Sequence, residues 1–319
     1  MPRFRTNRCK RARRAVSAAF GLLMTLLATQ ANAQSCTVSM TNVAFGTVNV
    51  LPGTAVDTTA TVTVDCHGGG SSSRVCVSIG CGSACDSTSR QMTGPSSATA
   101  RYDLYSDSGR TTLWGSWQTG YDTAGVQLTV PKNSTVNQTV YARFLASQQT
   151  DIAGSYTATL SSQPFITYVG SLSNNCPTGS NNASGSASVT ATVSSNCTIG
   201  STAISFGSQG LLSANTDAQG TLSIQCTSSL PYVVSLDGGT SGASNPTQRK
   251  MASGAENVIY GLYQDAARSL AWGSTSGVNT VSGTGTGSTQ TLTVYGRVAP
   301  QTTPSPATYT DTVVATVTY

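Results

Sequence analysis

The sequence YTDTVVATVTY, residues 309–319, alternates apolar and polar side chains with the two-residue period of a β-strand. Its apolar face carries Tyr309, Val313, Ala315, Val317 and Tyr319, and Asp311 interrupts that face. A strand needs a hydrogen-bonded partner along each edge. The printed sequence stops within this strand, so we expect the five apolar residues to form an edge that lacks a partner from its own chain.

The two halves of the sequence resemble each other, which is the signature of an internal repeat. Short motifs recur in the same order and at near-equal spacing. The matched pairs are SCTVSMTNVAFG (35–46) with NCTIGSTAISFG (196–207), RQM (90–92) with RKM (249–251), YDLYSDSGRTTLWGS (102–116) with YGLYQDAARSLAWGS (260–274), TVYARF (139–144) with TVYGRV (293–298), and YTATL (156–160) with YTDTV (309–313).

The first 33 residues have the pattern of a secretory signal peptide. Seven basic residues and no acidic one precede the apolar run AVSAAFGLLMTLLA, and the small residues ANA end at Ala33. Cleavage there would leave residues 34–319 with 10 basic and 12 acidic side chains, so the basic balance of the chain belongs to the leader. Without a basic patch, we expect no nucleic-acid partner.

Few charges, many small polar residues and alternating β-branched residues predict an all-β protein. The repeat predicts two tandem immunoglobulin-like β-sandwich domains of six or seven strands each, spanning residues 34–195 and 196–319. In each half one cysteine opens the first strand and another closes the second. We therefore expect the disulfides Cys36–Cys66 and Cys197–Cys226.

The halves differ at their ends. After YTATL the first half continues to SVTATV (188–193), another alternating strand, whereas the second half stops. We expect the first sandwich to be complete and the second to lack its final strand. An alternative alignment pairs SVTATV with VVATVTY (313–319) and treats the stretch between as an insertion. The spacing from Arg143 to Tyr156 and from Arg297 to Tyr309 favours the first alignment.

The repeated motifs together resemble spore coat protein U domains, the pilin-type domains of archaic chaperone–usher pili. The resemblance covers nearly all of residues 35–319, once per half. The two-domain form is most similar to the pilus tip adhesin of that family. The resemblance implies a self-complete adhesin domain followed by an incomplete pilin domain.

The same resemblance implies the partners and the location of the protein. The incomplete domain would be held by a periplasmic chaperone, pass the usher, and be completed by a strand of the next pilin subunit. The protein would reach the cell surface and attach to an abiotic or host surface in biofilm formation. Only residues 34 and 35 precede Cys36 in the cleaved chain, so we expect no donor segment and a place at the pilus tip. An alternative is a secreted spore-coat or matrix protein.

The apolar stretch PFITYVGSL (164–172) falls in a loop that we expect at the distal end of the first domain, with no counterpart in the second. The resemblance implies surface binding through exposed apolar loops. The candidate contact residues are Phe165, Ile166, Tyr168, Val169 and Leu172. The alternative is that the stretch extends a strand and packs in the core. Trp117 and Tyr121 would be stacking platforms if the protein instead bound carbohydrate.

Four further cysteines occur only in the first half. We expect Cys76–Cys176 and Cys81–Cys85, although four cysteines allow three connectivities. A zinc site that uses these thiols and His67, the single histidine, is the alternative. No nucleophile motif or phosphate loop surrounds His67, so we expect neither an enzyme nor a cofactor.

Overall fold

The computed structural model describes residues 34–86, 88–117, 125–169, 172, 176, 179 and 181–319. The expected signal peptide, residues 1–33, lies outside the described residues. The regular secondary structure of the described part is β-strand, apart from one short 3-10 helix, η1 (Pro95–Ser97). No helix in it is long and apolar enough to cross a membrane.

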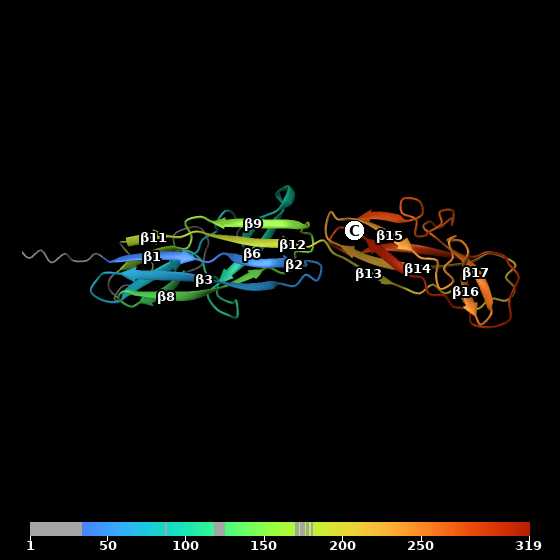
Figure 1. The fold of residues 1–319 in the computed structure, drawn as a ribbon, viewed down its shortest axis with the longest axis horizontal. Helices are drawn as coiled ribbons and strands as arrows, with labels where there is room; N and C mark the ends of the chain where they lie inside the picture. Colours follow the sequence, from blue (N-terminus) through green and yellow to red (C-terminus); the bar gives the residue numbers. More distant parts are fainter. Residues whose placement is uncertain are drawn as a thin grey trace, which may run out of the picture. The chain divides into compact units, whose positions relative to one another are not determined.

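Residues 35–193 form two sheets around one core (Figure 1). The larger sheet has the order β1-β3-β8-β6-β5-β9-β12-β2, and the smaller has the order β11-β10-β4-β7. The larger comprises β1 (Ser35–Met40), β2 (Val43–Val48), β3 (Val56–His67), β5 (Arg90–Thr93), β6 (Thr99–Tyr105), β8 (Ser134–Phe144), β9 (Gly154–Leu160) and β12 (Ala187–Val193). The smaller comprises β4 (Ser73–Ser78), β7 (Val126–Val130), β10 (Phe165–Val169) and β11 (Asn181–Ser184).

Residues 197–318 form a second pair of sheets around a separate core. The larger sheet has the order β13-β14-β19-β17-β16, and the smaller has the order β18-β15-β20. Their bounds are β13 (Cys197–Ser201), β14 (Thr216–Cys226), β15 (Pro231–Leu236), β16 (Arg249–Ser253), β17 (Glu256–Tyr263), β18 (Val281–Thr284), β19 (Gln290–Val298) and β20 (Ala315–Thr318). The all-β expectation is confirmed. The domain boundary at residue 195 stays a prediction.

A buried arginine explains why the Arg-x-Met and Trp-Gly-Ser motifs occur together in the first half. The guanidinium of Arg90 is fully buried. It donates from Nε to the carbonyl of Gly80 at 2.9 Å, and from Nη2 to the carbonyls of Ile79 and Trp114 at 2.6 Å each. Its Nη1 donates to Asp103 at 3.2 Å. One side chain therefore satisfies main-chain acceptors of two separate segments and the carboxylate of a third in the core.

Arg249 does the same in the second half. Its Nε donates to the carbonyl of Asp237 at 2.8 Å, and its Nη2 donates to the carbonyls of Leu236 and Trp272 at 3.2 and 2.9 Å. A fourth bond runs from Nη1 to the carbonyl of Pro246 at 2.6 Å. The repeated motifs thus mark equivalent points of the two cores rather than ligand-binding positions.

The repeated Val-Tyr-x-Arg motif has a different role, because its arginine lies on the surface. Arg143 pairs with both carboxylate oxygens of Asp57 at 2.7 and 2.9 Å. Arg297 pairs with both carboxylate oxygens of Asp217 at 2.7 and 2.8 Å. Solvent screening keeps the contribution of such exposed pairs small, on the order of 1 kcal/mol or less.

We predict that Arg90→Met lowers the free energy of unfolding by about 3–5 kcal/mol, because it removes the donors of three buried carbonyls and leaves the buried Asp103 without its charge partner. Arg143→Met, the matched surface control, lowers it by about 1 kcal/mol or less. Urea denaturation followed by tryptophan fluorescence measures both. Equal losses for the two variants would contradict a structural role for the buried arginine.

Candidate functional site

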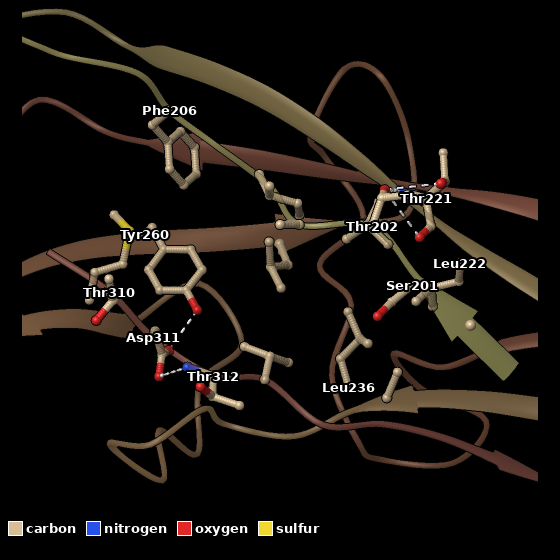
Figure 2. A pocket seen from close by; sticks show the side chains of 18 of the residues that line it. Ser201, Thr202, Phe206, Thr221, Leu222, Leu236, Tyr260, Thr310, Asp311 and Thr312 are labelled. Carbon is tan, nitrogen blue, oxygen red and sulfur yellow. Dashed lines mark hydrogen bonds between the residues drawn. The ribbon is translucent and has the colours of Figure 1, made fainter.

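A groove of about 590 Å³ opens in the second half of the chain. Residues 199–204 and Phe206 line it from one strand and the loop that follows it, and residues 309–313 and Ala315 line it from the C-terminal segment (Figure 2). The side chains between these two segments are mostly apolar: Leu222, Leu236, Met251, Tyr260, Leu262 and Val294. The groove therefore exposes part of what would otherwise be the core of this sandwich.

The tryptophans of the repeat show how the smaller sheets of the two halves correspond. The indole Nε1 of Trp114 donates to the carbonyl of Val77 in β4 at 3.0 Å. The indole Nε1 of Trp272 donates to the carbonyl of Val234 in β15, also at 3.0 Å. Strands β4 and β15 therefore occupy the same place in their halves.

A main-chain bridge shows which segments of the two larger sheets are equivalent. In the first half β5 and β9 meet at Thr93 and Thr157. In the second half an isolated bridge joins Ala252 to Thr310, and both residues occupy the equivalent positions in the repeat. Segment 309–313 is therefore the counterpart of β9.

Strand β12 closes the first half at the place where the second half is open. It runs antiparallel to β9 and parallel to β2, so it is hydrogen-bonded along both edges. Val189 pairs with Ala158 on one side and with Val43 on the other. Val189, Ala191 and Val193 are all buried in the core. The first half is therefore complete, in agreement with the expectation from sequence.

In the second half no described strand takes the place of β12. Segment 202–209, the counterpart of β2, and segment 309–314, the counterpart of β9, form no strand. Several positions that are buried in the first half are only partly buried here. The pairs are Phe45 and Phe206, Met92 and Met251, and Tyr156 and Tyr309, of which the first member is buried and the second partly exposed.

The C-terminal strand is shorter than the sequence predicts. The alternation of residues 309–319 predicts one continuous strand, but β20 begins at Ala315. Segment 309–314 has no continuous ladder on either side, and a strand persists only where its backbone groups are paired. This expectation was wrong because periodicity reports side-chain pattern and not the presence of a neighbouring strand.

The expectation that residues 164–172 have no counterpart was also wrong. In the first half Ile166 of β10 pairs with Val77 of β4. In the second half Val317 of β20 pairs with Val234 of β15. Strand β20 is therefore the counterpart of β10, and the described second half has no counterpart of β11 or of β12. The sequences FITY (165–168) and TVTY (316–319) share their last two residues, but they follow the YTATL and YTDTV motifs at different distances, and the alignment did not match them.

The five residues of the expected acceptor edge divide into two groups. Tyr309, Val313 and Ala315 line the groove. Val317 pairs with β15 and Tyr319 is 54% exposed, and neither lines the groove. The alternating apolar residues therefore lie in two different environments. Residues 309–313 and Ala315 line the open groove, whereas Val317 lies in a paired strand and Tyr319 is exposed.

Asp311 forms a polar cluster at one side of the groove. Its Oδ2 accepts a hydrogen bond from the hydroxyl of Tyr260 at 2.6 Å, and its Oδ1 accepts one from the amide of Thr312 at 2.8 Å (Figure 2). Oδ1 also accepts a hydrogen bond from the amide of Thr240 at 2.8 Å. Burial, followed by the bond to Asp311, raises the pKa of Tyr260 above its usual value. Gly239, at φ +68°, lies so close to the carboxylate that any Cβ there would collide with it. The cluster fixes segment 309–314 although this segment is not in a sheet.

The proposed contact residues of the first half are mostly in the core. Ile166 is fully buried and Tyr168 is 6% exposed, because β10 is a paired strand of the smaller sheet. Phe165 and Val169 are partly buried. Leu172 is 43% exposed and is the one residue of the five that faces solvent. The alternative that this stretch packs in the core agrees with the structure.

Of the two aromatic residues proposed for carbohydrate stacking, Trp117 and Tyr121, only Trp117 is among the described residues. Trp117 is half-buried, with its ring against Gly125. Tyr121 lies outside the described residues. Carbohydrate stacking by this pair therefore stays a prediction.

The eight cysteines of the described chain form four disulfides, with the pairings expected from the sequence: Cys36–Cys66, Cys76–Cys176, Cys81–Cys85 and Cys197–Cys226. Their thiols are therefore not available to zinc. His67 pairs instead with Asp65 at 2.9 Å and its side chain is 66% exposed. Among the described residues no group of histidine, cysteine and carboxylate side chains could hold a metal ion.

Sequence reasoning missed most of the groove. Ile204, Phe206 and Met251 lie in motifs of the repeat, and their first-half counterparts are core residues. Only the absence of a covering strand exposes them. The sequence did contain a usable signal. The residues that the last strand covers in the first half have counterparts in the second half, and those counterparts are exposed when that strand is missing.

We predict that Ile166→Ser lowers the free energy of unfolding by about 3–5 kcal/mol, because it removes a buried apolar side chain from the core of the first half. Leu172→Ser changes the free energy of unfolding by less than about 1 kcal/mol, because the native Leu172 side chain is 43% exposed. Thermal and urea denaturation of both variants measure the difference. A stable Ile166→Ser variant would place this strand outside the core.

Comparison with known proteins gives the family. The family model "Spore Coat Protein U domain" matches residues 22–162 and 183–316. "Protein U" of Myxococcus xanthus is 36% identical over 146 residues, which cover 40% of this chain and 80% of that protein.

Among solved structures, the chaperone–tip adhesion subunit complex CsuC–CsuE from the archaic chaperone–usher Csu pili of Acinetobacter baumannii matches with a TM-score of 0.54 and 17% identity. The match covers 89% of this chain and all of the matched chain. At this identity the likeness is one of fold. Two copies of the family's domain account for the repeat, and the chain belongs to the Spore Coat Protein U domain family.

Proposed function

We propose that the protein is the tip adhesin subunit of an archaic chaperone–usher pilus. In this proposal the first half makes contact with a surface, and the second half is completed by a strand from another subunit. The groove between segments 199–206 and 309–315 carries the proposal, because β12 fills the equivalent place in the first half. The fold of the CsuC–CsuE complex supports it.

An open sandwich of this kind needs a partner until it is completed. Unpaired strand edges and exposed core side chains favour aggregation. We infer that a periplasmic chaperone covers the groove first, and that the strand of the next pilin subunit replaces it at the usher. Export through the leader at residues 1–33 and oxidation of four disulfides fit this route to the cell surface.

The adhesive contact is proposed at the loops of the first half that connect β10 to β11 and β6 to β7. Leu172 supplies an exposed apolar side chain in the first loop, and Cys76–Cys176 attaches that loop to β4. A hydrophobic abiotic or host surface is the proposed target, with biofilm formation as the outcome. The protein in this role performs no catalysis.

A secreted coat or matrix protein built from the same domains is the second candidate. The description of the family, a spore coat protein domain, favours it. Such a protein would have no need of a chaperone or an usher. Dependence of its surface display on these two partners therefore separates the candidates.

We predict that residues 34–195 fold alone as a soluble monomer, because β12 completes their larger sheet. Residues 196–319 aggregate unless a chaperone or a strand peptide is added, because segments 202–209 and 309–314 have unpaired edges. Size-exclusion chromatography of the two separately expressed pieces measures this. A second half that is monomeric and stable by itself would refute strand completion.

A further inference from the structure

One residue of the groove, Asp311, differs in chemistry from its counterpart in the completed half. In the first half Ala158 of β9 lies directly opposite Val189 of β12, and both are buried. The repeat places Asp311 where the first half has Ala158. A strand that fills the groove as β12 does would therefore bring one of its inward-facing residues beside a carboxylate.

The carboxylate of Asp311 is not fully satisfied by its present partners. Oδ1 accepts two amide hydrogen bonds, from Thr240 and Thr312, whereas Oδ2 accepts one, from the hydroxyl of Tyr260. A carboxylate has about four acceptor positions, so Oδ2 can accept one more hydrogen bond. When a strand closes the groove, water is excluded, and an acceptor left without a donor opposes binding.

The other neighbour of the incoming residue is apolar. Val189 pairs with Val43 of β2 on its second side, and the repeat places Ile204 at the position of Val43. Ile204 lines the groove together with Asp311. The position therefore suits a β-branched side chain with one methyl group and one hydroxyl group, which is threonine.

We propose that Asp311 makes the groove selective for a strand with a threonine or serine hydroxyl opposite it, where the first half uses Val189. This inference rests on the proposed completion of the second half by a strand. The hydroxyl donates to Oδ2 of Asp311 and the rest of the side chain contacts Ile204. A lysine is disfavoured because a charge pair enclosed by the groove loses its hydration.

The experiment uses the chain of residues 34–319, refolded in the presence of fluorescently labelled peptides. The parent peptide is SASVTATVS, the sequence of residues 186–194, because it already forms the equivalent strand of the first half. The Val189→Thr peptide has nearly the same shape and adds a hydroxyl. We expect it to bind about tenfold more tightly, as one hydrogen bond to a charged group would produce, in fluorescence anisotropy.

A Val193→Thr peptide is the matched control, since no carboxylate faces that position, and it should bind no more tightly than the parent. In an Asp311→Ala chain the order of the parent and Val189→Thr peptides should reverse. The comparison on the native chain stands even if that variant does not fold. Equal binding of the parent and Val189→Thr peptides, or tightest binding by a Val189→Lys peptide, overturns the selectivity alone. No binding by any peptide overturns the proposed function as well.

Discussion

The hydrogen bonds that β12 makes along both of its edges are the interaction on which the difference between the two halves depends. They join β9 to β2 and so turn two exposed edges into one continuous sheet. The same strand buries a row of apolar side chains, including Val189 and Val193. Backbone groups must be paired somewhere, so its absence opens both edges and the core beneath them at once.

Both halves keep the same framework despite that difference, because their shared anchors lie away from the open edge. Arg90 and Arg249 each bind three or more core carbonyls from separate segments of the chain. Trp114 and Trp272 each bind a carbonyl of a central strand of the smaller sheet. None of these four side chains depends on β12 for its hydrogen bonds. The repeated motifs thus encode a framework that is common to the complete and the incomplete half.

Much of this could be predicted from the sequence, because the repeat compares the chain with itself. Fold class, the missing strand and the two disulfides common to both halves follow from matching motifs and spacing. The register of the C-terminal strand did not, since FITY (165–168) and TVTY (316–319) follow their shared upstream motif at different distances. The groove was missed for a related reason, because Phe206 becomes accessible only when a distant strand is absent. Such exposure depends on topology, which local patterns do not contain.

Asp311 shows how an incomplete sandwich can remain ordered at its open edge. In the first half the pairing of β9 with β12 holds Ala158 in place. An alanine side chain has no polar group, so it could not hold the segment by hydrogen bonds if that pairing were absent. A carboxylate can instead bind Tyr260 and the amide of Thr240, which belong to two separate segments. These bonds hold segment 309–314 beside the groove without closing it. The polar residue that interrupts the apolar alternation therefore replaces, in part, the strand pairing that this half of the chain lacks.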